Sequence, residues 1–273
     1  MPKKTILLLT DIANGESEDL ITAKYLESKY DVIISNLEDA EKYEDSVDLI
    51  LVRNTWPSDK KNAGNYNQLK QDFWKRVKDK KLNIYGGTDR FGDHSGKDYL
   101  IELFRKGYPV IPSIDSIKDI ELLPKSDKYL IKPKDGFSSI GVKILTRKKL
   151  LEQNPKEYII QPFVKFTSEI SFYFIGSDLI YCLSFSPSKI PDWPMPSIYI
   201  PTKEEIELVN RFVAWNKMAN GIQRIDMIKT QQGEFLLLEV EDESPYFSLT
   251  EINETKKDKF LKHLERSLKK YNL

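Results

Sequence analysis

The chain has 273 residues, of which 40% are hydrophobic and 31% charged, a composition typical of a soluble globular protein. Its 42 Lys and Arg residues equal its 42 Asp and Glu residues, which argues against a protein that binds nucleic acid through net positive charge. One cysteine, Cys182, rules out an intramolecular disulfide, and two histidines are too few for a histidine-based metal site. No segment approaches the roughly 18 apolar residues of a membrane helix. We therefore expect a cytoplasmic protein without nucleic-acid or membrane partners.

The first third of the chain alternates apolar runs with amphipathic stretches. These predict strands at 5–10, 30–35, 46–53 and 82–85, and helices at 16–29 and 68–77. This rhythm predicts a parallel sheet flanked by helices, with a ligand beyond the carboxyl ends of its strands. Asp11 and Arg53 follow two such ends and are candidates for contacting substrate, Arg53 by gripping a carboxylate. The alternative for Asp11 is that it caps a loop.

The middle of the chain predicts shorter elements. They are a helix over 95–106 with Ser95 as its N-cap, a strand at 109–112, a helix at 116–122, and strands at 129–132 and 142–145. Between the last two strands, residues 133–141 form a loop with small residues and two glycines, whose backbone N–H groups can cradle phosphate. It lacks the Gly-Lys-Ser/Thr of a Walker A loop, and most such hairpins are only hairpins.

The second half predicts an antiparallel sheet with a long connection. Strands are expected at 158–164, 169–174 and 178–185, followed by a proline-rich loop at 186–201 with the length of a lid. Helices are expected at 202–218 and 258–271. The first has Thr202 as N-cap and Glu205 three residues later, which is the capping-box pattern.

Residues 221–241 predict a β-hairpin that carries charge. Arg224 and Asp226 share one face of its first strand, and Leu237, Glu239 and Glu241 are predicted to share one face of its second. With a two-residue loop at 231–232, Arg224 would lie opposite Glu239, and Asp226 would be a diagonal neighbour.

Carboxylates gathered on one face of this hairpin are costly unless a positive group lies between them. A hard divalent cation arriving with phosphate is the natural candidate. The alternative is an ordinary solvated cross-strand ion pair, and the hairpin alone does not decide between them. Lys97 at a helix start and Lys132 at a strand end would add positive charge, although single lysines are more often merely solvated.

The order of these features resembles the ATP-grasp superfamily over nearly the whole chain. The R-x-D of 224–226 and the LLLE of 236–239 keep the spacing of that family's metal-binding Asp and Glu. Within it, the chain is similar to the glutathione-synthetase-type carboxylate–amine ligases, and most of all to the O-ureidoserine cyclo-ligases of cycloserine biosynthesis. The segments that carry this likeness are RNTW at 53–56, KDYL at 97–100 and GYPVIPS at 107–113.

The resemblance implies an ATP-grasp fold of the α/β and α+β classes. An N-terminal parallel α/β domain (1–88) would precede two α+β subdomains, 89–160 and 161–273, that sandwich ATP. It also implies roles for matching residues. These are phosphate contacts from Lys97 and Lys132; a closing loop with Gly136, Ser138, Ser139 and Gly141; an adenine-binding segment of Gln161, Pro162 and Phe163; Glu169 on the ribose; Asp226, Glu239 and Glu241 on Mg²⁺ or Mn²⁺; and Arg224 facing the transferred groups as the catalytic residue. Lys189, in the expected lid, is a further substrate candidate.

The activity implied is that of an ATP- and Mg²⁺-dependent ligase. A substrate carboxylate would attack the γ-phosphate to give an acyl phosphate and ADP, and an amine would then form an amide, between or within small amino-acid-like or peptide-like substrates. A second hypothesis is a non-catalytic ATP-binding sensor or partner module. A third, a metal-dependent hydrolase, is disfavoured by the neutral charge and the absence of further His or Asp clusters. The substrates and the oligomeric state, a homo-oligomer included, stay open.

Overall fold

The computed structural model describes residues 2–11, 17–56, 63–136, 140–153, 155–187, 195–271 and 273. Three predicted site residues, Ser138, Ser139 and Lys189, lie outside the described residues. The strands are β1 (Thr5–Leu9), β2 (Asp31–Ser35), β3 (Leu49–Val52), β4 (Lys128–Pro133), β5 (Lys143–Thr146), β6 (Tyr158–Pro162), β7 (Phe166–Ile175), β8 (Asp178–Phe185), β9 (Ser197–Ile198), β10 (Ile222–Thr230) and β11 (Phe235–Glu241). The helices are α1 (Ser17–Glu27), α2 (Ala63–Lys80), α3 (Tyr99–Arg105), α4 (Arg147–Gln153), α5 (Lys203–Asn216) and α6 (Glu254–Leu268), with short 3-10 helices η1 (Ala40–Lys42), η2 (Asp93–Ser95), η3 (Ile117–Leu122) and η4 (Lys269–Tyr271).

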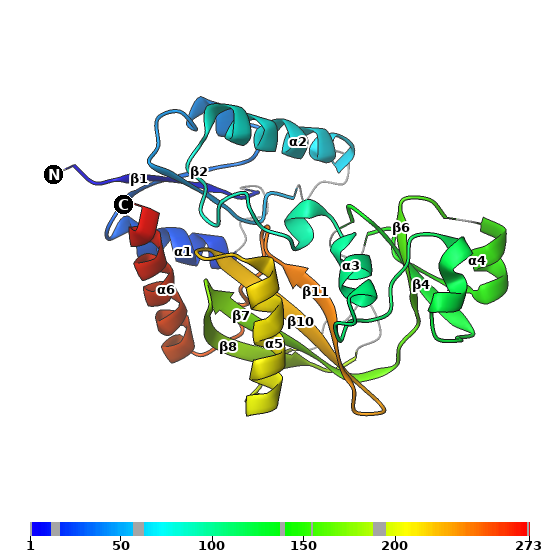
Figure 1. Cartoon of the computed structure of the whole chain (residues 1–273). Coiled ribbons are helices and arrows are strands. Elements are labelled where there is room, and N and C mark those ends of the chain that lie inside the picture. Colours follow the sequence, from blue (N-terminus) through cyan, green and yellow to red (C-terminus); the bar gives the residue numbers. More distant parts are fainter. Residues whose placement is uncertain are drawn as a thin grey trace.

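The first sheet is parallel, has the order β2-β1-β3, and is buried on both faces. Alternate residues of β1 serve two cores: Ile6 and Leu8 pack with α1 and α6, whereas Leu7 and Leu9 pack with α2 (Figure 1). This confirms the predicted parallel sheet with helices on both sides. The expected strand at 82–85 is reduced to a single bridge between Ile84 and Ile50.

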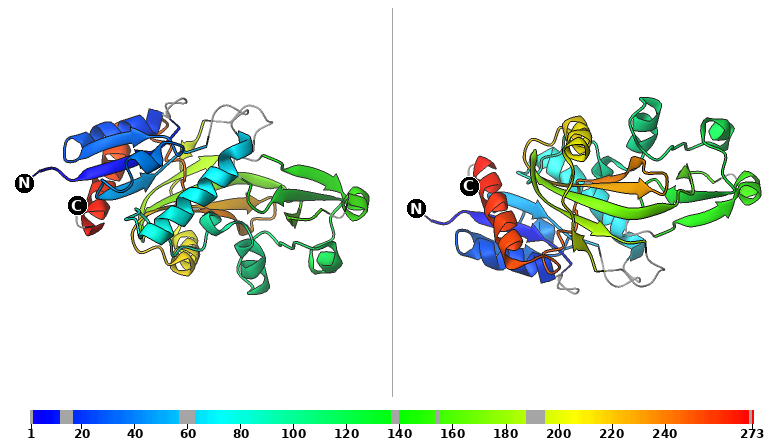
Figure 2. Two further views of the ribbon diagram at one scale, coloured as in Figure 1. Left: turned by 90° about the horizontal axis from the view of Figure 1, so that it is seen from above. Right: turned by 90° about the horizontal axis from the view of Figure 1, so that it is seen from below.

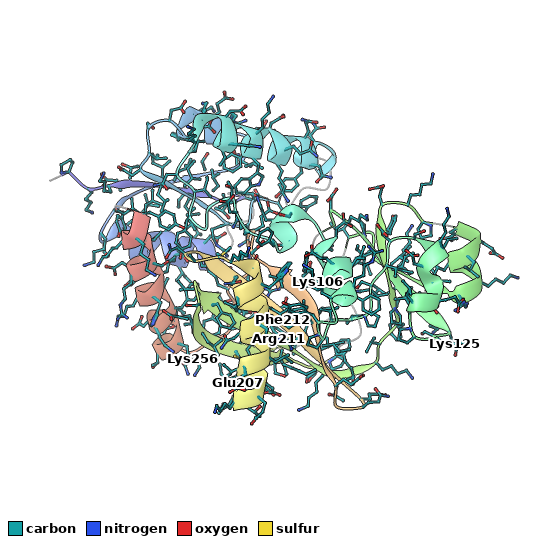
Figure 3. All side chains as sticks on the ribbon, viewed as in Figure 1. Lys106, Lys125, Glu207, Arg211, Phe212 and Lys256 are labelled. Carbon is teal, nitrogen blue, oxygen red and sulfur yellow. The ribbon has the colours of Figure 1, made fainter. Side chains whose placement is uncertain are left out.

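The largest sheet is antiparallel and has the order β11-β10-β7-β8-β9. Helix α5 covers one of its faces, where Phe212 is fully buried against Ile225 and Met227 while the neighbouring Arg211 is exposed (Figure 3). The predicted capping box of Thr202 and Glu205 starts this helix.

The third sheet has the order β5-β4-β6 and packs against α4 and η3. The helix expected over 95–106 begins only at Tyr99, so Ser95 is not its N-cap. Residues 93–95 form the separate 3-10 helix η2, and Gly96 follows with φ +83°, a left-handed conformation that interrupts a helix.

The β10–β11 hairpin differs from the predicted register. Arg224 lies opposite Glu241, and Asp226 lies opposite Glu239. The connection through 231–234 shifts the pairing by one residue, and a bulge shifts it by one more. A β-bulge follows Asp226, so the next pair is Met227 with Leu237. The extra residue turns Leu237 into the core under α5, whereas Glu239 stays on the face of Asp226.

The three sheets follow one another along the molecule. The parallel sheet lies at one end, the β5-β4-β6 sheet at the other, and the large sheet between them (Figure 2). The division into three domains remains a prediction, and β6 spans its boundary at residue 160. Within the described ranges, no helix has the length and apolar character needed to cross a membrane.

Candidate active site

Three neighbouring strands bring polar side chains onto the face of the large sheet opposite α5. Asp226 lies between Glu239 of β11 and Ser171 of β7, and the Ser171 hydroxyl donates a 2.7 Å hydrogen bond to its carboxylate. Arg224 lies between Glu241 and Tyr173 in the same way. We call this surface the charged face; its members are Glu169, Ser171, Tyr173, Arg224, Asp226, Glu239 and Glu241.

Arg224 is the centre of this face. Its Nε and Nη2 donate to the two carboxylate oxygens of Asp226 at 2.9 and 3.0 Å, and Nη2 also donates to Glu241 at 2.6 Å. Its Nη1 donates to the Tyr246 carbonyl at 3.1 Å. Burial acts to lower the pKa of Arg224, but the two carboxylates outweigh it and hold that pKa well above its ordinary value. The guanidinium is therefore charged and fixed in three directions.

Lys97 meets the charged face from outside the large sheet, and a second lysine, Lys132, lies close to Lys97. Lys97 forms an ion pair with Glu239, and its backbone N–H donates to the Lys134 carbonyl at 2.9 Å. Lys132 is buried at the end of β4, and burial, followed by the charge of Lys97, lowers its pKa to about 7. Burial also lowers the pKa of Lys97. Because their charged forms are poorly solvated, both ammonium groups would gain from a bound anion.

Burial disfavours the negative charge of two acids on this face, Glu169 and Glu241. Burial, with the nearby Asp226, raises the pKa of Glu169 to about 7. Burial also raises the pKa of Glu241 to about 7, although Arg224 opposes that shift. A bound cation would relieve these acids just as an anion would relieve the two lysines.

The donor set fits a magnesium ion that arrives with phosphate. In the part of the chain that the structure describes, no three Asp, Glu, His or Cys groups are gathered closely enough to hold a metal ion by themselves. Mg²⁺ in proteins commonly takes one or two carboxylates and completes its shell with phosphate oxygens and water. Asp226 and Glu239, which are direct cross-strand partners, supply two such carboxylates. Glu241, the predicted third ligand, is engaged by Arg224.

The third sheet presents an apolar strip beside Lys132. Leu130 of β4 pairs with Ile144 of β5, and Ile144 and Val142 are exposed by 53% and 36% although both are apolar. The opposite face of these strands is the packed core. An exposed apolar strip next to a buried ammonium suits a flat aromatic ring attached to an anion. The sequence analysis missed it, although Val142 and Ile144, two residues apart on a predicted strand, were the available signal.

The predicted adenine-binding segment lies where the third sheet leads into the large sheet. The Gln161 amide is buried and donates to Ser113 at 2.8 Å, Pro162 is buried, and Phe163 is 38% exposed. The described ends of the predicted phosphate loop pack on Pro133. A Cβ on Gly141, whose φ is +79°, would lie 2.8 Å from the Pro133 ring, and one on Gly136 would lie 3.1 Å from it.

Arg53 does not have the open setting that the sequence suggested. Its side chain is 1% exposed, and its donors go to Asp19 at 2.9 Å, Glu18 at 2.6 Å and the Pro245 carbonyl at 2.7 Å. A guanidinium with all these partners has no free fork for a substrate carboxylate, so that role is corrected for this structure. Asp11 lies beyond β1 as expected, with its N–H donating to Asn54.

A second group of residues near the charged face was not anticipated. Glu243 accepts from Lys70 at 2.5 Å and from the Trp74 indole at 3.0 Å, and His94 lies 3.7 Å away. Burial acts to raise the pKa of Glu243, but His94 and Lys70 hold it at about 2. The spacing of Lys70 and Trp74, four residues apart on α2, was the available sequence signal.

The chain was compared with known proteins by sequence and by structure. No family model and no curated protein matches the sequence. Among solved structures, D-cycloserine synthetase DcsG is similar with a TM-score of 0.73 at 18% identity, over 96% of this chain and 99% of that one. D-Alanine–D-alanine ligase from Bacillus anthracis, complexed with ATP, has a TM-score of 0.66 at 13% identity over 100% and 99%.

A third solved structure is the ATP-grasp ligase PsnB complexed with a minimal precursor. It has a TM-score of 0.65 at 13% identity and covers 97% of this chain and 99% of its own. At such identities the likeness concerns architecture, which here extends over almost the full length of each chain. The sequence motifs and the three sheets agree with that likeness, and the chain has the ATP-grasp fold.

Proposed function

We propose that this protein is an ATP- and Mg²⁺-dependent ligase that joins a carboxylate to an amine. The observation that carries the proposal is that Lys97 meets the acids of the charged face, with the buried Lys132 close to Lys97. Cations that need an anion lie beside acids that need a cation, and a metal-bound triphosphate satisfies both. The exposed apolar strip of Val142 and Ile144 beside Lys132 supports an adenine ring on the same side.

In this proposal Asp226 and Glu239 hold Mg²⁺, which, when bound, neutralises charge on the phosphates. Lys97 and Lys132 contact phosphate oxygens, and Glu169 contacts the ribose. The division of labour follows from the chemistry of phosphoryl transfer, in which the protein supplies position and charge rather than a covalent partner. The cytoplasm, which holds ATP and Mg²⁺, is the proposed setting.

The reaction proceeds in two steps. An oxygen of the substrate carboxylate attacks the γ-phosphorus, the bond from that phosphorus to the β-phosphate oxygen breaks, and ADP leaves. The amine nitrogen of the second group then attacks the acyl carbon, and phosphate leaves with the oxygen that came from the carboxylate. Arg224 lies where negative charge develops on the phosphoryl and acyl oxygens, and its fixed orientation requires little reorganisation during the reaction.

The substrates we propose are small amino-acid-like or peptide-like molecules. PsnB is described in complex with a precursor peptide, and D-alanine–D-alanine ligase is named for amino acids. The amide forms either between two molecules or within one. The group of Lys70, His94 and Glu243 adjoins the charged face from the side of the parallel sheet and is where substrate selectivity is proposed to reside.

The test is the release of ADP from Mg-ATP in the presence of a panel of amino acids and small dicarboxylates. Hydroxylamine in place of the amine should trap the acyl phosphate as a hydroxamate. With an ¹⁸O-labelled carboxylate, one label should appear in the phosphate released during amide formation. The hydroxamate shows that the acyl group is activated, and the label in phosphate, together with ADP release, is expected only of an acyl-phosphate route.

Two variants sharpen this test. The double variant Asp226→Ala/Glu239→Ala should lose the reaction, whereas Glu234→Ala, in the turn of the same hairpin, should keep it. Tight Mg-ATP binding without ADP release across the panel would instead support the non-catalytic ATP-binding module.

A further inference from the structure

One peptide unit, between Tyr246 and Phe247, connects helix α1, which packs on the parallel sheet, to the charged face. Its carbonyl oxygen, on Tyr246, accepts from Arg224 Nη1 at 3.1 Å. Its N–H, on Phe247, donates to the two carboxylate oxygens of Glu18 at 2.8 and 2.9 Å. A peptide unit is planar and stiff, so a shift at one end of it is felt at the other.

Glu18 is itself held firmly. Its side chain is 0% exposed, and Arg53 donates to it at 2.6 Å from the end of β3. The same guanidinium donates to the Pro245 carbonyl at 2.7 Å and lies 3.3 Å from the centre of the Phe247 ring. The residues on both sides of Tyr246 are therefore fixed by the same buried group.

This buried cluster is a costly way to join two parts of a protein. It removes the charges of Glu18, Asp19 and Arg53 from water. Packed apolar side chains in their place would often give equal or greater stability. Its geometry, however, does what apolar contacts do poorly: it sets the tilt of one chosen peptide by directional hydrogen bonds.

The tilt of that peptide matters because it carries the hydrogen bond that holds Arg224 from outside the hairpin. Its Nε and Nη2 are bound by Asp226 and Glu241 on the hairpin itself, and Tyr246 supplies the acceptor for Nη1 from a different segment. The Tyr246 carbonyl therefore ties the third nitrogen of the guanidinium to the segment that Glu18 and Arg53 hold.

We propose that Glu18 is a positioning residue for Arg224, acting through the Tyr246–Phe247 peptide, with Arg53 holding Glu18 in place. The expected effect on turnover rests on the proposed function, whereas the effect of Glu18 on the orientation of Arg224 does not. The position of the parallel sheet thereby controls the orientation of the guanidinium at the site of phosphoryl transfer.

The test begins with Glu18→Gln, which keeps the shape of the side chain but loses one acceptor and the charge that meets Arg53. We expect kcat to fall roughly 10- to 100-fold, as for a small misplacement of a catalytic group, with an almost unchanged KM for ATP. The second readout needs no catalysis. It is the ¹H–¹⁵N NMR signal of Arg224 Nε, identified by its loss in Arg224→Lys, which should shift or broaden in Glu18→Gln.

Glu44→Gln is the matched control. The Glu44 side chain is also 0% exposed and accepts from Arg76 and Lys80 at 3.0 Å, but these partners lie on α2 and not on the Tyr246 segment. This variant should lower the thermal midpoint while leaving kcat and the Arg224 signal as in the wild type.

An unmoved Arg224 signal in folded Glu18→Gln would overturn the proposal, and so would an equal loss of kcat in Glu44→Gln. If Glu18→Gln does not fold, Arg53→Lys tests the same link from Pro245: a shifted Arg224 signal supports it and an unmoved signal refutes it. A wild-type protein without ligase turnover would refute the proposed function. The Arg224 signal would still show whether Glu18 orients Arg224.

Discussion

Asp226 and Glu239 are direct cross-strand partners, yet each is neutralised by a different cation from a different part of the chain. Asp226 is held by Arg224 on its own strand at 2.9 Å, and Glu239 is held by Lys97, which precedes α3. When metal and phosphate bind, these partnerships can be exchanged without leaving a charge unpaired. In the proposed site, the metal would take the carboxylate of Glu239 and the phosphate would take the ammonium of Lys97.

This exchange predicts that nucleotide binding depends on metal through these two acids. Asp226→Asn and Glu239→Gln should each weaken Mg-ATP binding by at least roughly tenfold, a loss of the size seen when groups around a metal are changed. In the wild type, chelation of the metal should have a similar effect, and in the variants it should have little further effect. Calorimetric titration with a non-hydrolysable ATP analogue, with and without Mg²⁺, measures both. Equal metal dependence in wild type and variants would contradict the assignment.

Arg224→Ala is expected to lower kcat by about 10² to 10³-fold while leaving nucleotide affinity within a few-fold of the wild type. The loss corresponds to one preorganised charge removed from the transition state. Steady-state kinetics and a binding titration on the same preparations separate the two quantities.

The control for Arg224→Ala is Arg211→Ala. Arg211 is an exposed arginine on α5, on the side of the sheet away from the charged face (Figure 3). It should behave as the wild type in both assays. A loss of nucleotide affinity in Arg224→Ala as large as its loss of kcat would instead give Arg224 a binding role.

Local patterns in the sequence were enough for much of this fold. Alternation placed Arg224 and Asp226 on one face, and the spacing of Thr202 and Glu205 identified the start of α5. The register of the hairpin was not predictable, because it depends on a bulge after Asp226 that leaves no mark in hydrophobic alternation.

Contacts between residues far apart in the sequence also could not be predicted. Arg53 was correctly located at a strand end, but its partner Glu18 is 35 residues away in sequence and Pro245 is 192 residues away. A single sequence carries no signal that joins such positions. Ser171 and Tyr173 could have been predicted as members of the charged face from the sequence. They alternate with apolar residues along β7 and share a face with Glu169.

Lys132 should make the stability of the free protein depend on pH. Its pKa is about 7 in the folded protein, lowered by burial and by Lys97, against an ordinary value of 10.5. Between these values the unfolded chain binds more protons, so the free energy of unfolding should rise with pH from about 7 to about 10.5. Lys132→Met should therefore raise the thermal midpoint at pH 6, and this gain should shrink toward pH 10.

The contrast is Lys134, two residues further along. Its hydrogen bonds to Asp98 and Asp115 raise its pKa, so its charged form stabilises the fold below pH 10.5, its ordinary pKa. Lys134→Met should thus lower the thermal midpoint where Lys132→Met raises it. Shifts of the same sign in both variants at pH 6 would contradict this account of Lys132.

Phosphate binding should return the missing proton to Lys132, because an anion favours the ammonium form. At pH 8, binding of an ATP analogue should then be accompanied by proton uptake, visible as a dependence of the calorimetric heat on the ionisation enthalpy of the buffer. Lys132→Met should lose that uptake, and a wild type without any uptake would place Lys132 away from the phosphates.

Gly141→Ala should impair nucleotide binding through the contact of the predicted phosphate loop with Pro133. Its matched control is Gly107→Ala. The two glycines have φ values of +79° and +73°, so alanine at either position carries a left-handed penalty of roughly 1–2 kcal/mol. Only at Gly141 would the new Cβ also meet a neighbour, at 2.8 Å from the Pro133 ring; nothing lies within 4 Å at Gly107.

Both variants should lower the thermal midpoint, but only Gly141→Ala should displace the loop next to Lys132 and weaken ATP binding. Equal affinities for ATP in the two variants would show that the loop's contact with Pro133 has no part in binding the phosphates.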